Sequence, residues 1–190
     1  MAKREILLCG DPVLRAKAAH VTEITDDVVQ LLEDMAQTMI EAPGVGLAAP
    51  QVGEAIRAIV VRADIEDGME VHYLLNPRLV ETEGEVEALE GCLSLPTLQG
   101  YVVRPEKVVA EALGLDGRPV RLEANGLLGR AIQHEIDHLD GVLFVDLVDE
   151  ETLGWMVPDT AEEDGYRIEP ATVAEVKERF DRLQRRKAKA

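Results

Sequence analysis

Residues 133–138 place two histidines four positions apart, with a glutamate directly after the first of them. In a helix of 3.6 residues per turn, His134 and His138 lie on one face, so both rings can reach one ion at roughly 2.0–2.1 Å. Glu135 lies beside that pair, where a carboxylate can hold a metal-bound water and take its proton. The segment therefore predicts a helix that carries a metal site.

Apolar side chains around this motif recur at helical spacing, between turn signals at 125–126 and 140–141. They are Leu127, Leu128, Ala131, Ile132 and Ile136. Because they cover much of the helix surface, we expect a mostly buried helix with the histidines toward its C-terminal end.

The rest of the chain mixes helical and strand patterns without regular alternation. Residues 26–41 have apolar side chains at helical spacing, with Thr25 as N-cap, and predict an N-terminal amphipathic helix. The predicted strands are 56–61, 71–75, 107–113 and 120–123, the last two forming a hairpin. We therefore expect an α+β domain, with mostly antiparallel strands packed around the central metal-binding helix and a further helix at the C-terminus.

Composition limits the classes of protein to consider. The 190 residues are 46% hydrophobic, which suffices for one domain with a large core. A formal net charge of −17 argues against a DNA-binding surface. Two cysteines cannot build a disulfide framework, and the apolar run at 6–8 is too short for a signal peptide or membrane span. We expect a cytoplasmic protein without a membrane partner.

The C-terminal part differs in character from the predicted catalytic core, residues 1–147. Residues 148–170 predict an acidic surface excursion, anchored on the core by Trp155. Residues 171–188 predict a basic amphipathic helix, whose capping box is formed by Thr172 and Glu175. Its apolar stripe comprises Val173, Val176, Phe180 and Leu183. The net charge of +5 from Lys177 onward suggests a polyanionic partner, although cations also suit a helix C-terminus.

A tetrahedral ion held by two histidines needs a third protein ligand and an open position for water. Cys92, in the segment 90–96, is a candidate donor, and its alternative role is that of a small core residue. Residues 44–51 are rich in glycine and alanine and end in Gln51, whose amide can donate a hydrogen bond to a ligand. We expect Cys9, which precedes a turn, to be a core residue.

These three segments together resemble the peptide deformylases. The resemblance rests on the glycine-rich stretch 44–51, on Glu-Gly-Cys-Leu-Ser at 90–94 and on Gln-His-Glu-Ile-Asp-His-Leu at 133–139, in the order of the family. Residues 10–15 also resemble the N-terminal region of that family, so the resemblance covers roughly residues 5–147. It implies a hydrolase that removes the formyl group from the N-terminal formylmethionine of newly made polypeptides, by attack of a metal-bound hydroxide.

The resemblance also implies a role for each matched residue. Cys92, His134 and His138 would bind one divalent metal, with Glu135 as general base and acid. The Gln51 amide and the Leu93 backbone N–H would stabilise the oxyanion. The implied substrate-binding residues are Val45, Gly46, Gly91 and Leu127, the last near the methionine pocket. Ferrous iron is the implied physiological ion, and one thiolate with two imidazoles also suits zinc, nickel or cobalt.

One departure from the pattern of the family concerns the residues that would bind the peptide beyond methionine. Family members often carry an arginine shortly after the Glu-Gly-Cys-Leu-Ser segment, whereas here residues 97–100 are Thr-Leu-Gln-Gly and the next arginine is Arg104. Arg130, one turn before His134, either compensates or is a solvated surface residue. The stretch 148–165 is also longer than expected.

Two other classes of function compete with this interpretation. A zinc peptidase shares the His-Glu-x-x-His helix, but such enzymes usually take their third ligand downstream. A ribosome-docking protein could keep a metal for structure alone, although it would need neither Glu135 nor Gln51. The basic tail fits a hypothesis in which the last helix docks on ribosomal RNA near the exit of the nascent chain.

Overall fold

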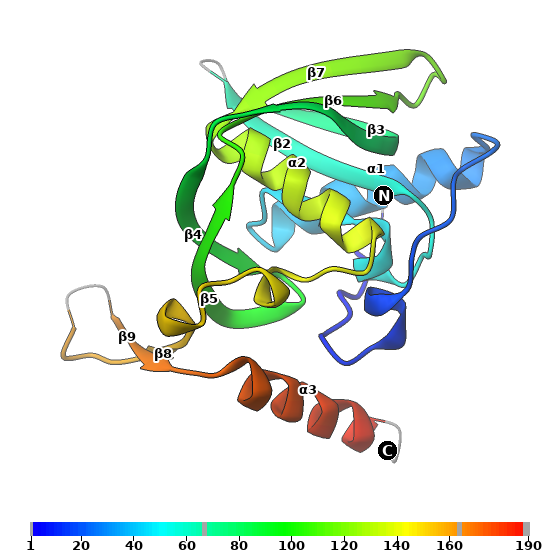
Figure 1. Cartoon of the computed structure of the whole chain (residues 1–190). Coiled ribbons are helices and arrows are strands. Elements are labelled where there is room, and N and C mark those ends of the chain that lie inside the picture. The colour runs from blue at the N-terminus through cyan, green and yellow to red at the C-terminus, as the bar shows by residue number, and fades with distance from the viewer. Residues whose placement is uncertain (1, 66–67, 163–164, 188–190) are drawn as a thin grey trace.

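The structure is a computed structural model that describes residues 2–65, 68–162 and 165–187. Two antiparallel sheets and three α-helices form an α+β fold, as predicted (Figure 1). The helices are α1 (Asp26–Glu41), α2 (Gly126–Leu139) and α3 (Val173–Lys187). The strands are β1 (Gly46–Ala48), β2 (Ala58–Ile65), β3 (Gly68–Glu83), β4 (Val86–Cys92), β5 (Leu95–Arg104), β6 (Lys107–Leu113), β7 (Pro119–Asn125), β8 (Gly154–Pro158) and β9 (Tyr166–Pro170).

The first sheet has five strands in the order β1-β2-β3-β6-β7 and lies between two helices. Side chains alternate across β2, so Ile59 and Val61 pack with α2, whereas Ala58 and Val60 pack with α1. Both faces of this part of the sheet are therefore buried. Burial of each large apolar side chain contributes about 1.5–3 kcal/mol. Packing against the sheet therefore stabilises both helices in addition to their intrinsic helix propensity.

Both core helices agree closely with the sequence. α1 has the predicted bounds, and the Thr25 side chain caps it by accepting a hydrogen bond from the Val28 N–H. α2 begins at Gly126 and ends directly before Asp140. Ten of its residues are buried, including both histidines, and Figure 1 shows it crossing the centre of the molecule. The predicted central helix is thus confirmed.

The strands agree less well at their ends. The hairpin of β6 and β7 is as predicted, but the strand predicted at 56–61 is shifted to 58–65. Ile56 instead forms an isolated parallel bridge with Ala19. The strand predicted at 71–75 extends over 68–83, because its charged end pairs with β6 up to the register Glu83↔Lys107.

The second sheet has the order β4-β5-β8-β9 and includes part of the predicted acidic excursion. The β4–β5 hairpin turns directly after Cys92, which pairs with Leu95. Pro96 lies inside β5, although proline is usually confined to the first residue, the edge or a bulge of a strand. The register jumps there from Gly91↔Gln99 to Cys92↔Leu95, so Pro96 has no partner on β4 that needs its missing N–H.

Residues 154–158 and 166–170, placed by sequence in the excursion, pair as β8 and β9, and β8 also pairs with β5. α3 follows, and the predicted capping box is present: the Thr172 N–H donates to Glu175 and the Glu175 N–H donates to the Thr172 hydroxyl. Residue 188, the predicted end of this helix, lies outside the described residues.

The apolar stripe of α3 packs mainly through two of its residues. Val176 and Phe180 are buried, while Leu183 is 38% exposed. Trp155 anchors this region on the core as predicted, because it packs in one cluster with Leu98 and Phe144. Its ring also lies 6.1 Å from that of Phe180 and under the guanidinium of Arg179 at 4.1 Å. Among the described residues, no helix is long and apolar enough to cross a membrane.

Candidate metal centre

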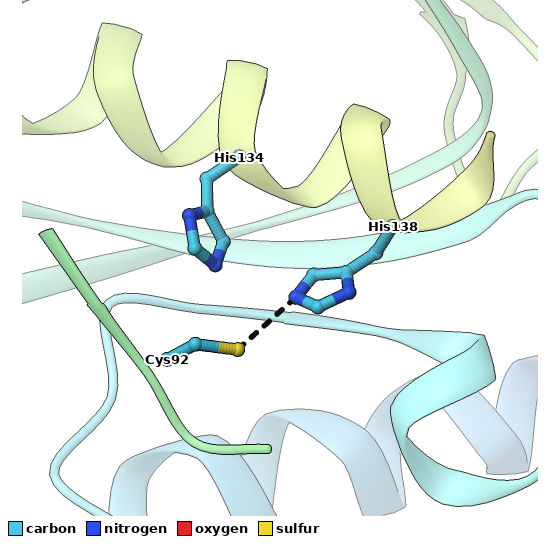
Figure 2. Close-up of side chains that lie close together, drawn as sticks. All are labelled: Cys92, His134 and His138. Carbon is cyan, nitrogen blue, oxygen red and sulfur yellow. Dashed lines mark hydrogen bonds between the residues drawn. The ribbon is translucent and has the colours of Figure 1, made fainter. Parts of the chain in front are cut away.

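Three potential metal ligands converge from two parts of the chain (Figure 2). Cys92 comes from the end of β4, and His134 and His138 come from one face of α2, their ring centroids 5.0 Å apart. Cys92 Sγ lies 3.3 Å from His138 Nε2, and the ligand atoms of all three residues lie within 4.8 Å of one another. The fold thus brings together the three ligands that the resemblance implied.

This donor set fits a divalent ion. One soft sulfur and two imidazole nitrogens suit zinc or ferrous iron, and tetrahedral binding at about 2.0–2.3 Å requires ligand atoms roughly 3.3–3.7 Å apart. The Cys92–His138 pair already has such a separation, and small side-chain rotations would bring in His134. Three protein ligands leave the fourth position open to water, as catalytic sites require.

Glu90 fixes the orientation of the His134 ring through a hydrogen bond at Nδ1. Its Oε2 lies 3.0 Å from His134 Nδ1, which leaves Nε2 of that ring for an ion. Burial alone would raise the pKa of Glu90, but hydrogen bonds from His134 and Arg104 outweigh it and lower the pKa to about 2. Sequence reasoning missed this role, although Glu90 opens the 90–94 segment on which the resemblance rests.

Arg104, the first arginine after the 90–94 segment, and Arg130, considered for the substrate groove, both bind that same carboxylate. Arg104 donates to Glu90 through Nε at 2.6 Å and Nη2 at 3.0 Å, and to Asp137 through Nη1 at 2.7 Å. Arg130 donates to Glu90 at 2.6 Å and to two backbone carbonyls. Arg130 is therefore buried, not a solvated surface residue, and neither side chain is free to hold a peptide.

The two histidines differ in their electrostatic environment. For His134, burial alone would lower the pKa, but hydrogen bonds with Cys92 and Glu90 outweigh it, so the pKa lies well above its usual value of 6.5. Burial and the nearby His134 charge lower the pKa of His138 well below 6.5. His138 Nδ1 is buried without a hydrogen-bond partner among the described residues. A neutral His138 is the form that binds a metal.

Glu135 is buried beside the ligands, and its Oε2 has no hydrogen-bond partner in the described part of the chain. Burial raises its pKa to about 7, close to what a residue that accepts and returns a proton needs. Gly46 makes room for this carboxylate: a Cβ there would lie 2.7 Å from Glu135 Cγ. The predicted groove residue thus contacts the predicted base.

Gln51 points its amide nitrogen at the same site. Its Nε2 lies 3.6 Å from Cys92 Sγ and 3.2 Å from the hydroxyl of Ser94, while Oε1 accepts a hydrogen bond from the Ala48 N–H at 2.8 Å. These bonds fix which end of the amide faces the metal ligands. Leu93 follows Cys92 in the chain, and the role of its N–H stays a prediction.

The other predicted substrate residues come from the segment before β1, from β4 and from the first turn of α2. Val45 and the 60% exposed Leu127 line one groove, which also reaches β2, β3, β6 and β7. Gly91 lies on β4 next to Cys92 and opposite Gln99. Cys9 is a core residue, as predicted.

Residues 3–153 match the model of one family, described as polypeptide deformylase. The chain belongs to the polypeptide deformylase family. Its members are enzymes, and the Cys92, His134 and His138 cluster accords with their need for a divalent metal.

Individual relatives of the family extend the match. A peptide deformylase of Halothermothrix orenii is 51% identical over 144 residues, which is 76% of this chain and 92% of that protein. One of Symbiobacterium thermophilum is 48% identical over 177 residues, 93% of this chain and 77% of that protein. The crystal structure of a peptide deformylase from Legionella pneumophila matches with a TM-score of 0.75 and 37% identity, covering 97% of this chain and 99% of that one. The similarity therefore includes the C-terminal part in some family members.

Proposed function

We propose that this chain removes the formyl group from the N-terminal formylmethionine of newly made polypeptides in the cytoplasm. Membership of the deformylase family supports the reaction. The observation that carries the proposal is the convergence of the buried Glu135 carboxylate and the Gln51 amide on the Cys92, His134 and His138 cluster. A site that only held an ion would need neither group.

Cys92, His134 and His138 would hold the ion, which when bound acts as a Lewis acid that lowers the pKa of water from about 15.7 to near 7. Glu135 takes a proton from the water that attacks the formyl carbon and gives it to the departing amine. The Gln51 amide and the Leu93 N–H donate hydrogen bonds to the formyl oxygen as it gains negative charge. Formate and a free N-terminus result.

The test is formate release from formyl-Met-Ala-Ser by anaerobically purified protein, compared with Glu135→Gln. Loss of the base should lower kcat by about 10²–10⁴ while the bound metal is retained. Glu87→Gln, an exposed residue on the same strand as Cys92, is the matched control. Cleavage of internal peptide bonds without formate release would instead favour a zinc peptidase.

Ferrous iron is our proposal for the ion in the cell. A thiolate with two imidazoles also binds zinc, nickel or cobalt, so availability decides between them. Iron-loaded protein should lose activity in air, because ferrous iron is oxidised and zinc is not. Equal losses in the iron-loaded and zinc-loaded forms would contradict this assignment.

We further propose that α3 docks on ribosomal RNA. Of its described cations, Arg182 and Arg185 are exposed, Lys177 lies 3.9 Å from Asp146, and Arg179 covers Trp155. Replacing Arg182, Arg185 and Arg186 by Gln should reduce ribosome co-sedimentation, most at low salt, without changing turnover of short peptides. Substitution is a cleaner test than deletion from Lys177, which would also remove the buried Phe180. Unchanged co-sedimentation would refute docking.

A further inference from the structure

Ser94 is the only serine of the chain, and it lies in the turn between β4 and β5. Its side chain is fully buried, with 0% exposed. A hydroxyl that is removed from water needs a hydrogen-bond partner inside the protein. The partner here is the side-chain amide of Gln51, which lies 43 positions earlier in the chain. The hydroxyl therefore serves a long-range contact.

The Gln51 amide nitrogen carries two hydrogens and has two different acceptors. Its Nε2 lies 3.2 Å from Ser94 Oγ and 3.6 Å from Cys92 Sγ. Because Cys92 is one of the three potential metal ligands, the hydrogen directed at its sulfur faces the candidate metal centre. Neutral sulfur is a weak acceptor, so a substrate oxygen can take over that hydrogen while the bond to Ser94 persists.

Two hydrogen bonds together fix the plane of the Gln51 amide. The last torsion of a glutamine side chain is broad, so an amide held at one end can still turn. The Ala48 N–H holds Oε1 at 2.8 Å, and the Ser94 hydroxyl holds Nε2. What the hydroxyl adds beyond Cys92 Sγ is therefore a fixed direction for the second amide hydrogen.

One segment near the N-terminus holds Gln51 and Ser94 in place through its backbone. The Leu7 N–H donates to the Gln51 carbonyl at 2.8 Å, and the Cys9 N–H donates to the Ser94 carbonyl at 2.9 Å. Gln51 belongs to the short 3-10 helix Ala49–Val52, whereas Ser94 belongs to a different part of the fold. Because the two donors are two positions apart, they limit how far the two acceptors can separate.

We propose that Ser94 is a positioning residue, which orients the Gln51 amide so that its second N–H points at the oxygen of the substrate formyl group. Ser94 acts through Gln51 and does not itself touch the substrate. Donors that are already oriented stabilise the charge that develops on such an oxygen. The proposal rests on the deformylase function proposed above and adds a residue to its oxyanion site.

The test is a double-mutant cycle on formate release from formyl-Met-Ala-Ser. Ser94→Ala should lower kcat by about 10-fold to 10²-fold with little change in KM or metal content, because the amide is misdirected only toward the developing charge. Gln51→Leu should lower kcat by about 10²–10³. Adding Ser94→Ala to Gln51→Leu should cost less than about twofold more, because the amide on which Ser94 acts is already absent.

Three outcomes of the cycle would overturn the proposal. One is a wild-type kcat in Ser94→Ala. Another is an equal fold-loss from Ser94→Ala with and without Gln51, which would show a general structural role. Thr38→Val is the matched control, because it removes a fully buried hydroxyl from α1. It should lower stability to urea and leave kcat unchanged, and a loss of kcat equal to that of Ser94→Ala is the third such outcome.

A second measurement does not depend on turnover. The Gln51 side-chain amide hydrogens should exchange with solvent more slowly in the wild type than in Ser94→Ala, as NMR can measure. Equal exchange rates in the two proteins would overturn the proposal. Absence of formate release by the wild type would instead refute the deformylase function, and the exchange rates would still test the bond between Gln51 and Ser94.

Discussion

Glu90 and His134 share a hydrogen bond of 3.0 Å at Nδ1, on the far side of the imidazole from Nε2. The carboxylate thereby selects the tautomer that leaves Nε2 available to an ion, although Glu90 is not itself one of the three potential ligands. Removal of such a partner typically lowers metal affinity by about 10–100-fold. We expect Glu90→Gln to weaken metal binding by that factor, measured by competition with a chelator.

The same substitution should also destabilise the fold, because Arg104 and Arg130 would be left as buried charges with fewer partners. Breaking a buried ion pair from one side costs about 3–5 kcal/mol. Glu87→Gln, exposed on the same strand, should change neither quantity. Wild-type metal affinity in Glu90→Gln would show that Glu90 stabilises the fold through its ion pairs but does not orient His134 for metal binding.

Gly46→Ala should impair catalysis with little effect on the metal. The added Cβ would overlap the Glu135 side chain and displace its carboxylate. A misplacement of about 1 Å can cost about 10² in rate, so kcat should fall by that order while metal content stays constant. Gly114→Ala, in the turn between β6 and β7, is the control, and an equal loss there would discount the steric argument.

Phe180→Ala should detach α3 from the core. Its ring is 2% exposed and packs on Trp155, and truncation of such a side chain costs about 3–5 kcal/mol. Because Val176 and Phe180 are the buried apolar side chains of the described part of α3, we expect local opening, seen as faster amide exchange confined to α3. Leu183→Ala, at a 38% exposed position, should have a much smaller effect. Similar exchange in the two variants would contradict the packing described.

The Asp34 carboxylate makes the free energy of unfolding depend on pH under acid conditions. Hydrogen bonds from the Ala2 N–H at 2.7 Å, from Gln30 and from Arg4 hold its pKa below the ordinary 3.8. A lowered folded-state pKa stabilises the fold above pH 3.8, and this contribution is lost as the pH falls through the lower value. The stability difference between wild type and Asp34→Asn should therefore narrow below about pH 4, as urea unfolding can measure. A constant difference from pH 7 to pH 3 would contradict it.

Local sequence signals sufficed for elements whose partners lie nearby in the chain. The N-cap at Thr25 and the apolar spacing after it predicted α1 to its bounds, and the turn at Asp116-Gly117 predicted the β6–β7 hairpin. His134 and His138 could be paired from helical periodicity alone. Cys92 could be joined to them only through the family resemblance, because no local rule connects β4 with α2.

Long-range partners explain what the sequence did not show. Arg130 has the same helical surroundings whether it is exposed or buried, and its burial follows from Glu90, 40 positions away. The acidic composition of 148–165 predicted a surface excursion and gave no sign of the β8–β9 hairpin. That hairpin forms because β8 pairs with the edge of β5 that β4 leaves free. Pro96 is tolerated inside β5 because the irregular register beside it removes the need for its N–H, and nothing in the local sequence shows that register.

The position of Cys92 and His138, 46 residues apart in the chain, gives the metal centre a second consequence. An ion bound to both would act as a cross-link between the four-stranded sheet and the central helix. β8 pairs with β5, and α3 packs on Trp155. Removal of the ion by a chelator should therefore lower the stability of β8, β9 and α3 as well as that of the site. The bound ion would then both stabilise the fold and serve the reaction.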